Sequence, residues 1–273
     1  MKIIEPQIIV NKSEIDLVKL INIERAGRTC YKSDSEYSTK SATEFIKKLI
    51  ANGHDSVLEH EKITVMIIVD RGVTHEIVRH RIASYSQEST RYCNYQDSKY
   101  GTEITVIKPY FFENSEKMKI WKKNCVECEK AYMKLIEQGA TPQEARSVLP
   151  NSLKTEIVVT YNFREWRHFF KLRCAGGAHP QMRQIAIPLL LFFAKQFPCL
   201  FDDINIHIRS DIIPRIVSVA FRHIVVYVPR VMVYSYYCFV IRLVDILVLY
   251  LLDFRIDAQP YCTAFYLSQS VIL

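Results

Sequence analysis

The stretch Arg79–Tyr92 (RHRIASYSQESTRY) is the feature that most limits how this chain can fold. It holds three arginines, a histidine, four serine or threonine hydroxyls and two tyrosines, with very few apolar side chains. Such a segment buries too little apolar area to build a core, so it must lie at a surface. The apolar run Ile63–Val69 precedes it, and we expect that run to form a rigid strand. The forked donors and hydroxyls predict an anion site, most simply a nucleotide site.

Two other interpretations of this stretch are a solvated basic surface and a nucleic-acid contact patch. Its hydroxyls, Gln87 and Glu88 are interleaved with the arginines, which argues against a bare basic surface. No wider Lys/Arg stripe surrounds it, and Glu88 and Asp97 interrupt the positive charge, which argues against nucleic acid. The net charge of +7 favours anionic partners but does not distinguish between them.

The chain of 273 residues suits one large domain, or one domain with an appendage. Its eight cysteines are scattered, and Met1–Val10 lacks the apolar core of a secretory signal. We therefore expect free thiols and a cytoplasmic location. Cys125 and Cys128 lie in a helical pattern with no second Cys or His pair nearby, so no metal is expected.

Periodicity and capping residues predict an α+β fold, with no βαβ alternation and no glycine-rich phosphate loop. Strands are expected at 2–10, 61–70, 103–108 and 152–161. Helices are expected at 13–28, 41–51, 73–81, 115–138, 141–150, 164–173 and 180–196. Ser13 is expected to cap the first helix, and Asn52-Gly53 to end the second.

The composition changes after Asp203, and residues 204–273 contain no Lys, Glu or Gly. We therefore divide the chain into a domain at 1–203 and an atypical apolar extension at 204–273. Within the extension, Val231–Phe254 approaches the length of a membrane span, but Arg242 and Asp245 would be costly there, so membrane contact is not expected. A packed or partner-bound extension remains open, as does a segment foreign to the fold, for example from a shifted reading frame. The last is slightly preferred.

A second polar constellation is the segment His54–His60 (HDSVLEH). The i, i+6 spacing of its histidines does not place them on one helical face, which disfavours a metal site. It is expected to be a loop in which Ser56 and Glu59 form a capping-box pair. A polar loop that contacts a cofactor fits the same residues equally well.

A third constellation begins where a strand is expected to meet a helix, at Asn162 and Arg164. Backbone amides at a helix start attract anions, and His168 lies four residues after Arg164 on the same helical face. Arg173 is followed by a glycine-containing loop that ends at His179, which would let the guanidinium approach a planar ligand. Arg146 is a further candidate. As charges on amphipathic helices, these residues would be unremarkable.

Arg79-His80-Arg81, then seven residues, then Ser89, with Arg91-Tyr92 behind, resembles the signature of the flavin-dependent thymidylate synthases. The resemblance runs from the first strand to about Phe201. It implies an α+β fold with mixed helices and an antiparallel sheet, assembled as a homotetramer with sites between subunits. It also implies conversion of dUMP to dTMP, with methylenetetrahydrofolate as carbon donor, FAD as hydride carrier and NADPH as reductant. No nucleic-acid partner is implied.

The resemblance assigns roles to matching positions. Those implied to hold flavin or line its folate side are His54, Ser56, Glu59, Arg79, His80, Arg81, Asn162, Arg164, His168 and His179. Those implied to bind dUMP are Glu76, Arg79, Gln87, Ser89, Thr90, Arg91, Arg146 and Arg173. Arg173 is implied to be catalytic, since a guanidinium can stabilise negative charge on the uracil carbonyls. The loop before His179 is two residues longer than in the family, and Glu76 stands where some members have glutamine.

Two further hypotheses stay open beside this one. The chain could bind a nucleotide or RNA through its basic cluster without catalysis. It could also be a family member made inactive or unstable by its extension. Ser89 has no adjacent histidine–carboxylate pair in the sequence, so it is expected to be a substrate ligand rather than a nucleophile.

Overall fold

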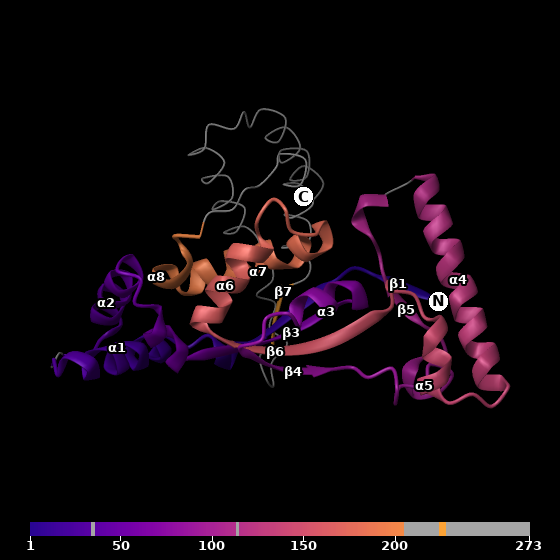
Figure 1. The fold of residues 1–273 in the computed structure, drawn as a ribbon, viewed down its shortest axis with the longest axis horizontal. Helices are drawn as coiled ribbons and strands as arrows, with labels where there is room; N and C mark the ends of the chain where they lie inside the picture. The colour runs from indigo at the N-terminus through magenta and orange to yellow at the C-terminus, as the bar shows by residue number, and fades with distance from the viewer. Residues whose placement is uncertain (34–35, 113–114, 205–223, 228–273) are drawn as a thin grey trace, which may run out of the picture. The chain divides into compact units, whose positions relative to one another are not determined.

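A five-stranded sheet organises the chain (Figure 1), and its strand order is β4-β6-β3-β2-β7. The computed structural model describes residues 1–33, 36–112, 115–204 and 224–227. The strands are β2 (Gln7–Asn11), β3 (Lys62–Asp70), β4 (Ala83–Gln87), β6 (Lys154–Asn162) and β7 (Ile224–Tyr227). Neighbouring strands are antiparallel, except that β7 runs parallel to β2. The predicted α+β class with an antiparallel sheet is therefore confirmed.

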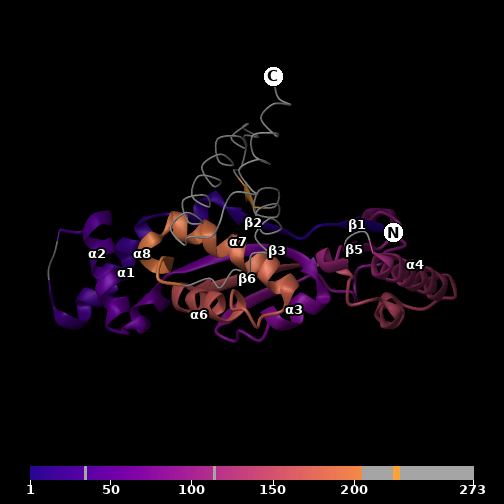
Figure 2. The ribbon, with the colours of Figure 1, turned by 90° about the horizontal axis from the view of Figure 1, so that it is seen from above.

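The two long central strands alternate between a covered and an open face. On β6, Ile157, Val159 and Tyr161 are buried, whereas Val158 on the opposite face is exposed. Figure 2 shows α6, α7 and α3 lying over the covered face. These helices span Phe163–Arg173 for α6, Pro180–Gln196 for α7 and Arg71–Ile77 for α3. The buried aromatic side chains of α6 and α7, led by Trp166, form the main core together with Val73 and Ile77 of α3.

Two helices, α1 (Val18–Tyr31) and α2 (Thr39–Ala51), pack against each other beside this core. Gly27 allows their close contact, because a Cβ there would lie 2.5 Å from the Phe45 ring, which would have to move. The 3-10 helix η2 (Asp55–His60) follows α2 and contacts α1 and α6. The short helix α8 (Pro198–Phe201) packs against α2 and α7.

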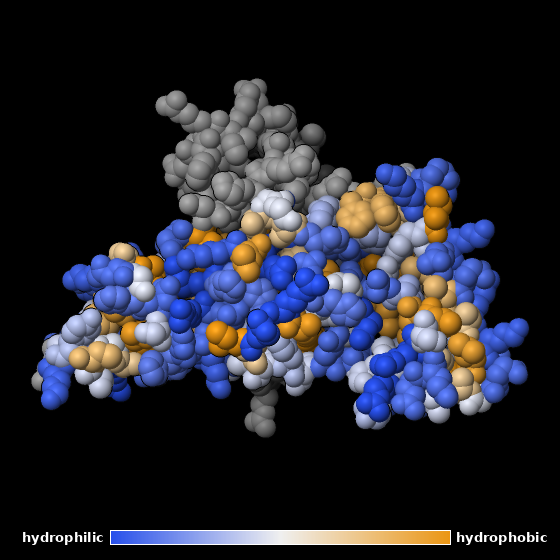
Figure 3. All heavy atoms as spheres, viewed as in Figure 1, coloured by the Kyte–Doolittle hydropathy of each residue, from blue (hydrophilic) through white to orange (hydrophobic). Residues whose placement is uncertain are grey.

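A smaller apolar cluster forms where β1 (Lys2–Ile4) pairs in parallel with β5 (Thr105–Ile107). The long helix α4 (Glu116–Glu137), the short helix α5 (Pro142–Ala145) and the 3-10 turn η5 (Arg146–Val148) surround it. Its buried members are Tyr95, Ile104, Val106, Cys125, Tyr132, Ala145 and Leu153. Figure 3 shows that hydrophilic side chains predominate over the middle of this face of the molecule, between α6 and β4.

Several predicted boundaries are wrong for local reasons. The first expected strand is interrupted at Glu5-Pro6, since proline cannot donate to a strand ladder, and it forms β1 and β2. The first expected helix begins at Val18, because Asn11 rather than Ser13 caps a separate 3-10 turn, η1 (Lys12–Glu14). The helix expected from 73 to 81 ends at Ile77, and the one expected from 141 continues only as the turn η5.

The polar stretch 79–92 contains a strand that the sequence did not predict. β4 pairs with β6 along the sheet edge, from Ala83 opposite Tyr161 to Gln87 opposite Ile157. Its residues alternate between half-buried and exposed, so it lacks the apolar pattern of an ordinary strand. The polar stretch is therefore held by the sheet, as expected, but residues 83–87 of the stretch are themselves a strand of that sheet.

Most of the extension at 204–273, including Val231–Phe254, lies outside the described residues. Beyond Ile204 the described part is β7, which pairs with β2 from Ile8 opposite Ile224 to Asn11 opposite Tyr227. No helix in the described part of the chain is long and apolar enough to cross a membrane. The six described cysteines carry free thiols, as expected.

Candidate active site

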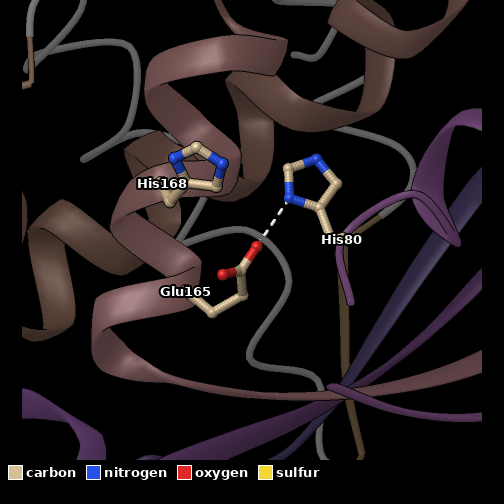
Figure 4. Close-up of side chains that lie close together, drawn as sticks. All are labelled: His80, Glu165 and His168. Atoms are coloured by element: carbon tan, nitrogen blue, oxygen red, sulfur yellow. Dashed lines mark hydrogen bonds and ion pairs between the residues drawn. The ribbon is translucent and has the colours of Figure 1, made fainter. Parts of the chain in front are cut away.

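His80 is the centre of a buried polar cluster, in the loop that joins α3 to β4. Its Nδ1 lies 2.7 Å from a carboxylate oxygen of Glu165 on α6, and Arg173 Nε donates to its Nε2 at 3.1 Å (Figure 4 draws the first contact). An arginine side chain has no acceptor, so His80 Nε2 must accept and Nδ1 must carry the proton. The two partners thus define a single tautomer of a neutral imidazole.

Burial lowers the pKa of His80 below its ordinary value of 6.5. The nearby Arg173 charge lowers this pKa further, while the hydrogen bond and charge of Glu165 oppose the shift. Desolvation disfavours the charged form of a histidine, so the neutral imidazole is favoured at pH 7. The electrostatics therefore agree with the tautomer that the hydrogen bonds define.

Arg173 ends α6 and points back to Glu76 on α3. Its Nη1 lies 2.8 Å from Glu76 Oε2, and its Nη2 donates to the Glu76 backbone oxygen at 3.0 Å. With Nε on His80, all three nitrogens of the guanidinium are engaged. The Arg173 side chain nonetheless remains 17% exposed, so this firmly held cation is not fully closed off from solvent.

Two tyrosines fix the backbone on either side of His80. The Tyr85 hydroxyl donates to the His80 carbonyl at 2.5 Å and lies 2.8 Å from the Tyr161 hydroxyl. Tyr161 in turn donates to the Ile77 carbonyl at 3.2 Å. Burial raises the pKa of both phenols, so they stay protonated. β4 is thereby tied to the end of α3.

The arginines of the signature lie outside this cluster. Arg79, Arg81, Arg91 and Arg146 are exposed. Among the described residues, the guanidinium groups of Arg79, Arg81 and Arg146 make no hydrogen bond or ion pair, and that of Arg91 only stacks on the Tyr92 ring. Unpaired guanidiniums are available to bind phosphate or carboxylate. We call these four side chains the arginine rim.

Other predicted substrate residues follow β4. Gln87 is half-buried, and its side-chain amide donates to the hydroxyls of Thr74 and Thr155, at 3.1 and 3.2 Å. Ser89 is half-buried and its hydroxyl accepts from the Arg91 amide at 3.3 Å, whereas Thr90 is buried. This turn is therefore partly ordered by its own side chains.

The segment from His54 to His60 is the 3-10 helix η2, with His54 and Ser56 exposed. The predicted capping pair of Ser56 and Glu59 is wrong, because η2 has no side-chain cap hydrogen bond. Glu59 instead accepts from Arg164 Nη1 at 2.5 Å. This ion pair joins two segments that are far apart in the sequence and that the family resemblance assigns to the flavin.

The remaining candidates lie at helix starts or on the exposed side of α6. Asn162 caps α6 by accepting from the Glu165 amide at 2.8 Å. His168 is exposed, and its ring lies 5.5 Å from that of His80 (Figure 4). His179 caps α7 and, with Asp70 and Glu76, lines a pocket of about 320 Å³.

The structure thus brings Glu76, His80, His168 and Arg173 into one place, and joins Glu59 to Arg164. In the part of the chain that it describes, Arg146 makes no hydrogen bond or ion pair with the other candidates. Glu165 was not predicted from the sequence. The sequence pattern around Glu165 is an acidic residue three positions after an Asn cap, and this pattern ordinarily indicates the start of a helix.

The atoms of His80, Glu165 and His168 that could bind a metal lie within 4.8 Å of one another. Both nitrogens of His80 are already engaged, by Glu165 and by the Arg173 cation. A metal ion would have to displace Arg173 or the proton on Nδ1. The cluster is therefore better suited to orienting Arg173 than to holding a cation.

The fold is therefore that of an α+β protein with a mixed sheet, which holds one partly exposed arginine in a single orientation and leaves the arginine rim unpaired, and unpaired guanidiniums are suited to binding anions. The family model described as "Thymidylate synthase complementing protein" matches residues 18–199, and the chain belongs to this family. The resemblance inferred from the signature is thereby confirmed.

Curated relatives carry the name flavin-dependent thymidylate synthase. The one from Geobacter sulfurreducens is 37% identical over 186 residues, which cover 65% of this chain and 78% of the relative. The one from Mycobacteroides abscessus is 36% identical over 207 residues, covering 69% and 81%. One from Mycobacterium tuberculosis is 34% identical over the same length.

Proposed function

We propose that this protein is a flavin-dependent thymidylate synthase, which methylates dUMP to dTMP in thymidylate biosynthesis. The carbon donor is methylenetetrahydrofolate, and FAD reduced by NADPH is the hydride carrier. The observation that carries the proposal is the guanidinium of Arg173, which His80 and Glu76 hold in one orientation while the side chain stays partly exposed. This arrangement supports a role for Arg173 in stabilising the negative charge that develops on a planar substrate.

We assign the candidate residues to two anionic ligands. The exposed side chains proposed for FAD come from the His54 segment, the signature and α6. They are His54, Ser56, Glu59, Arg79, Arg81, Arg164 and His168. His80, Asn162 and His179 complete this proposed set. For dUMP, Arg91 and Arg146 would hold the phosphate, while Glu76, Arg79, Gln87, Ser89 and Thr90 would surround the nucleoside with Arg173.

In this proposal bound FAD supplies hydride chemistry, and the protein orients and polarises. Arg173 donates to a uracil carbonyl and stabilises the negative charge that develops there. Arg91 and Arg146 neutralise the phosphate and hold the nucleotide in register. Ser89 is a substrate ligand rather than a nucleophile, since its hydroxyl contacts the Arg91 amide instead of a base.

We further propose a cytoplasmic homotetramer in which each site is shared between chains. Ile82 and Tyr92, within the signature stretch, are 62% and 75% exposed. Apolar side chains this exposed beside a ligand site are typical of surfaces that another protein covers. A shared site also accounts for Arg146, which makes no hydrogen bond or ion pair with the other candidates within the described chain.

The decisive experiment measures flavin and product together. Purified protein that shows flavin absorbance bands and forms dTMP from dUMP, methylenetetrahydrofolate and NADPH supports the proposal. A colourless protein that takes up no flavin contradicts it and favours the second candidate, a nucleotide- or RNA-binding protein without catalysis. The exposed, unpaired arginine rim is the observation that keeps this second candidate in view.

We also propose that the functional domain lies at 1–203 and that the extension at 204–273 adds no catalytic group. Chains ending after Ile204 and after Tyr227 separate two contributions, because the longer one retains β7. Equal assembly and turnover in both shortened chains and the full chain would support the division. Loss of assembly only in the shorter chain would show that β7 belongs to the domain.

A further inference from the structure

Glu165 is the buried acid of the His80 cluster, and the helix start does not explain its position. Glu165 is the third residue of α6, and Asn162 caps this helix by accepting a hydrogen bond from the backbone amide of Glu165. In a capping box, an acid at this position turns back to the amide of the cap residue. The helices α2 and α5 both have a capping box, but the carboxylate of Glu165 instead lies against His80 at 2.7 Å.

Burying this carboxylate costs free energy that a partner must offset. The Glu165 and His80 residues are 6% and 4% exposed. A buried charge is tolerated when it is hydrogen-bonded, and the helix N-terminus adds a favourable dipole. The hydrogen bond to His80 is the side-chain contact that the structure gives to this carboxylate.

The position of the His80 proton decides whether Arg173 has an acceptor. With the proton on Nδ1, the Nε2 lone pair receives Arg173 Nε at 3.1 Å. With the proton on Nε2, two N–H donors would face each other and the Arg173 contact would be lost. Glu165 can accept from Nδ1 but, as a carboxylate, cannot donate to it. It therefore selects the tautomer that holds Arg173.

We propose that Glu165 is a positioning residue that acts through His80: it keeps the proton on Nδ1 and thereby aims the Arg173 guanidinium. The part of this inference that places Arg173 on the uracil ring rests on the proposed function. The part that concerns the tautomer stands on the contacts alone. Glu76 completes the arrangement by fixing the two Nη nitrogens.

The experiment compares Glu165→Gln, Glu165→Leu and wild type in the full-length protein. Magic-angle-spinning ¹⁵N spectra of histidine-labelled protein distinguish protonated from unprotonated ring nitrogens. The chain has eight histidines, so His80→Gln identifies the signals of His80. Glu127→Gln, which removes an exposed carboxylate on α4, is the matched control. Turnover, KM for dUMP and flavin content are measured on the same preparations.

We expect wild type and Glu165→Gln to carry the proton on Nδ1, because the glutamine oxygen still accepts. In Glu165→Leu a buried Nδ1 proton would have no acceptor, so it should shift to Nε2 at the expense of the Arg173 contact, and kcat should fall by about 10²-fold, the effect of a misplaced catalytic group. Glu165→Gln should keep kcat within about threefold of wild type, and protonate His80 at lower pH because a favourable charge is lost. A merely structural acid would change stability without moving the proton.

A proton on Nε2 in wild type would overturn the proposal. So would an unchanged tautomer and kcat in Glu165→Leu. If the leucine variant does not fold, the pH midpoint of His80 in Glu165→Gln decides, and an unchanged midpoint contradicts the role of the carboxylate. If wild type has the expected tautomer but takes up no flavin and forms no dTMP, the proposed function fails while the Glu165–His80–Arg173 arrangement stands.

Discussion

His80 and three of the four rim arginines come from one stretch of chain, yet the protein gives them very different numbers of polar partners. His80 is buried, and both of its nitrogens have protein partners. In the part of the chain that is described, the guanidiniums of Arg79, Arg81 and Arg146 make no hydrogen bond or ion pair. Preorganised groups suit a role in the transition state, whereas unpaired surface cations suit ligand capture. The comparison therefore distinguishes a side chain held by protein partners from side chains that are left available to a ligand.

The largest expected effect is on the cluster. Arg173→Ala should lower dTMP formation by about 10²–10³-fold, the usual result of removing a donor that stabilises developing charge. Arg173→Lys should restore little, since a lysine cannot engage His80 and Glu76 together as the arginine fork does. Steady-state turnover with NADPH, with flavin content as a control, measures this. Retained turnover would remove Arg173 from the mechanism.

The rim should respond in KM rather than in stability. Arg91→Ala or Arg146→Ala should raise KM for dUMP by about 10- to 100-fold, the equivalent of one charge-assisted hydrogen bond. The melting temperature should change little, because these side chains are exposed. Arg25→Ala, an exposed arginine on α1, is the matched control. A large loss of stability in the rim variants, with KM for dUMP unchanged, would contradict the view that the rim binds ligand and does not stabilise the fold.

The cluster should also make stability depend on pH. The pKa of His80 is lowered in the folded state, so below about pH 6.5 the unfolded chain binds a proton that the folded chain does not. The free energy of unfolding should therefore fall as pH drops below 6.5, by at most about 1.4 kcal/mol per pH unit, until the lowered pKa is reached. Glu165, Arg173 and His168 are the charged or titratable groups around it.

Denaturant titrations of wild type and His80→Gln between pH 5 and 7 isolate this contribution. Below about pH 6.5 the free energy of unfolding should fall more steeply with decreasing pH in wild type than in His80→Gln. Above about pH 6.5 the two curves should run parallel. Parallel curves over the whole range would mean that His80 is not the group responsible.

The smallest expected effect concerns the ion pair of Arg164 and Glu59. Their side chains are 51% and 41% exposed, and exposed pairs contribute little to stability. Glu59→Gln should change the free energy of unfolding by less than about 0.5 kcal/mol. Flavin affinity should weaken a few-fold if the pair holds the cofactor, as measured by fluorescence titration. The exposed pair of Lys119 and Glu116 on α4 provides the control, with Glu116→Gln.

The sequence predicted most of the helices and strands because their apolar periodicity is strong. The helix Pro180–Gln196 and the strand near 61–70 are where they were expected. β4 was missed because it lies at a sheet edge with polar residues, and its formation depends on pairing with β6. The helix start at Ser13 was wrong because Asn11 competes for the capping role.

The site was predicted as a set of residues but not as two environments. Arginine spacing in the signature predicted a set of ligand donors, and Arg79, Arg81 and Arg91 are exposed, as such donors must be; their binding roles stay a prediction. The partners of His80 could not be predicted, because Glu165 is 85 residues away in the sequence and its pattern is that of an ordinary helix start. Only the tertiary packing of α6 against the loop after α3 brings them together.

The hydroxyl of Tyr85 has a consequence for how this motif tolerates change in length. It reaches from β4 back to the carbonyl of His80, and its neighbour Tyr161 reaches the carbonyl of Ile77. An insertion or deletion between His80 and Tyr85 would reverse the side of the strand on which the tyrosine lies. The number of residues between the two halves of the signature is therefore constrained by strand pairing at the sheet edge. Substitutions in this segment should be accepted far more readily than a single added residue.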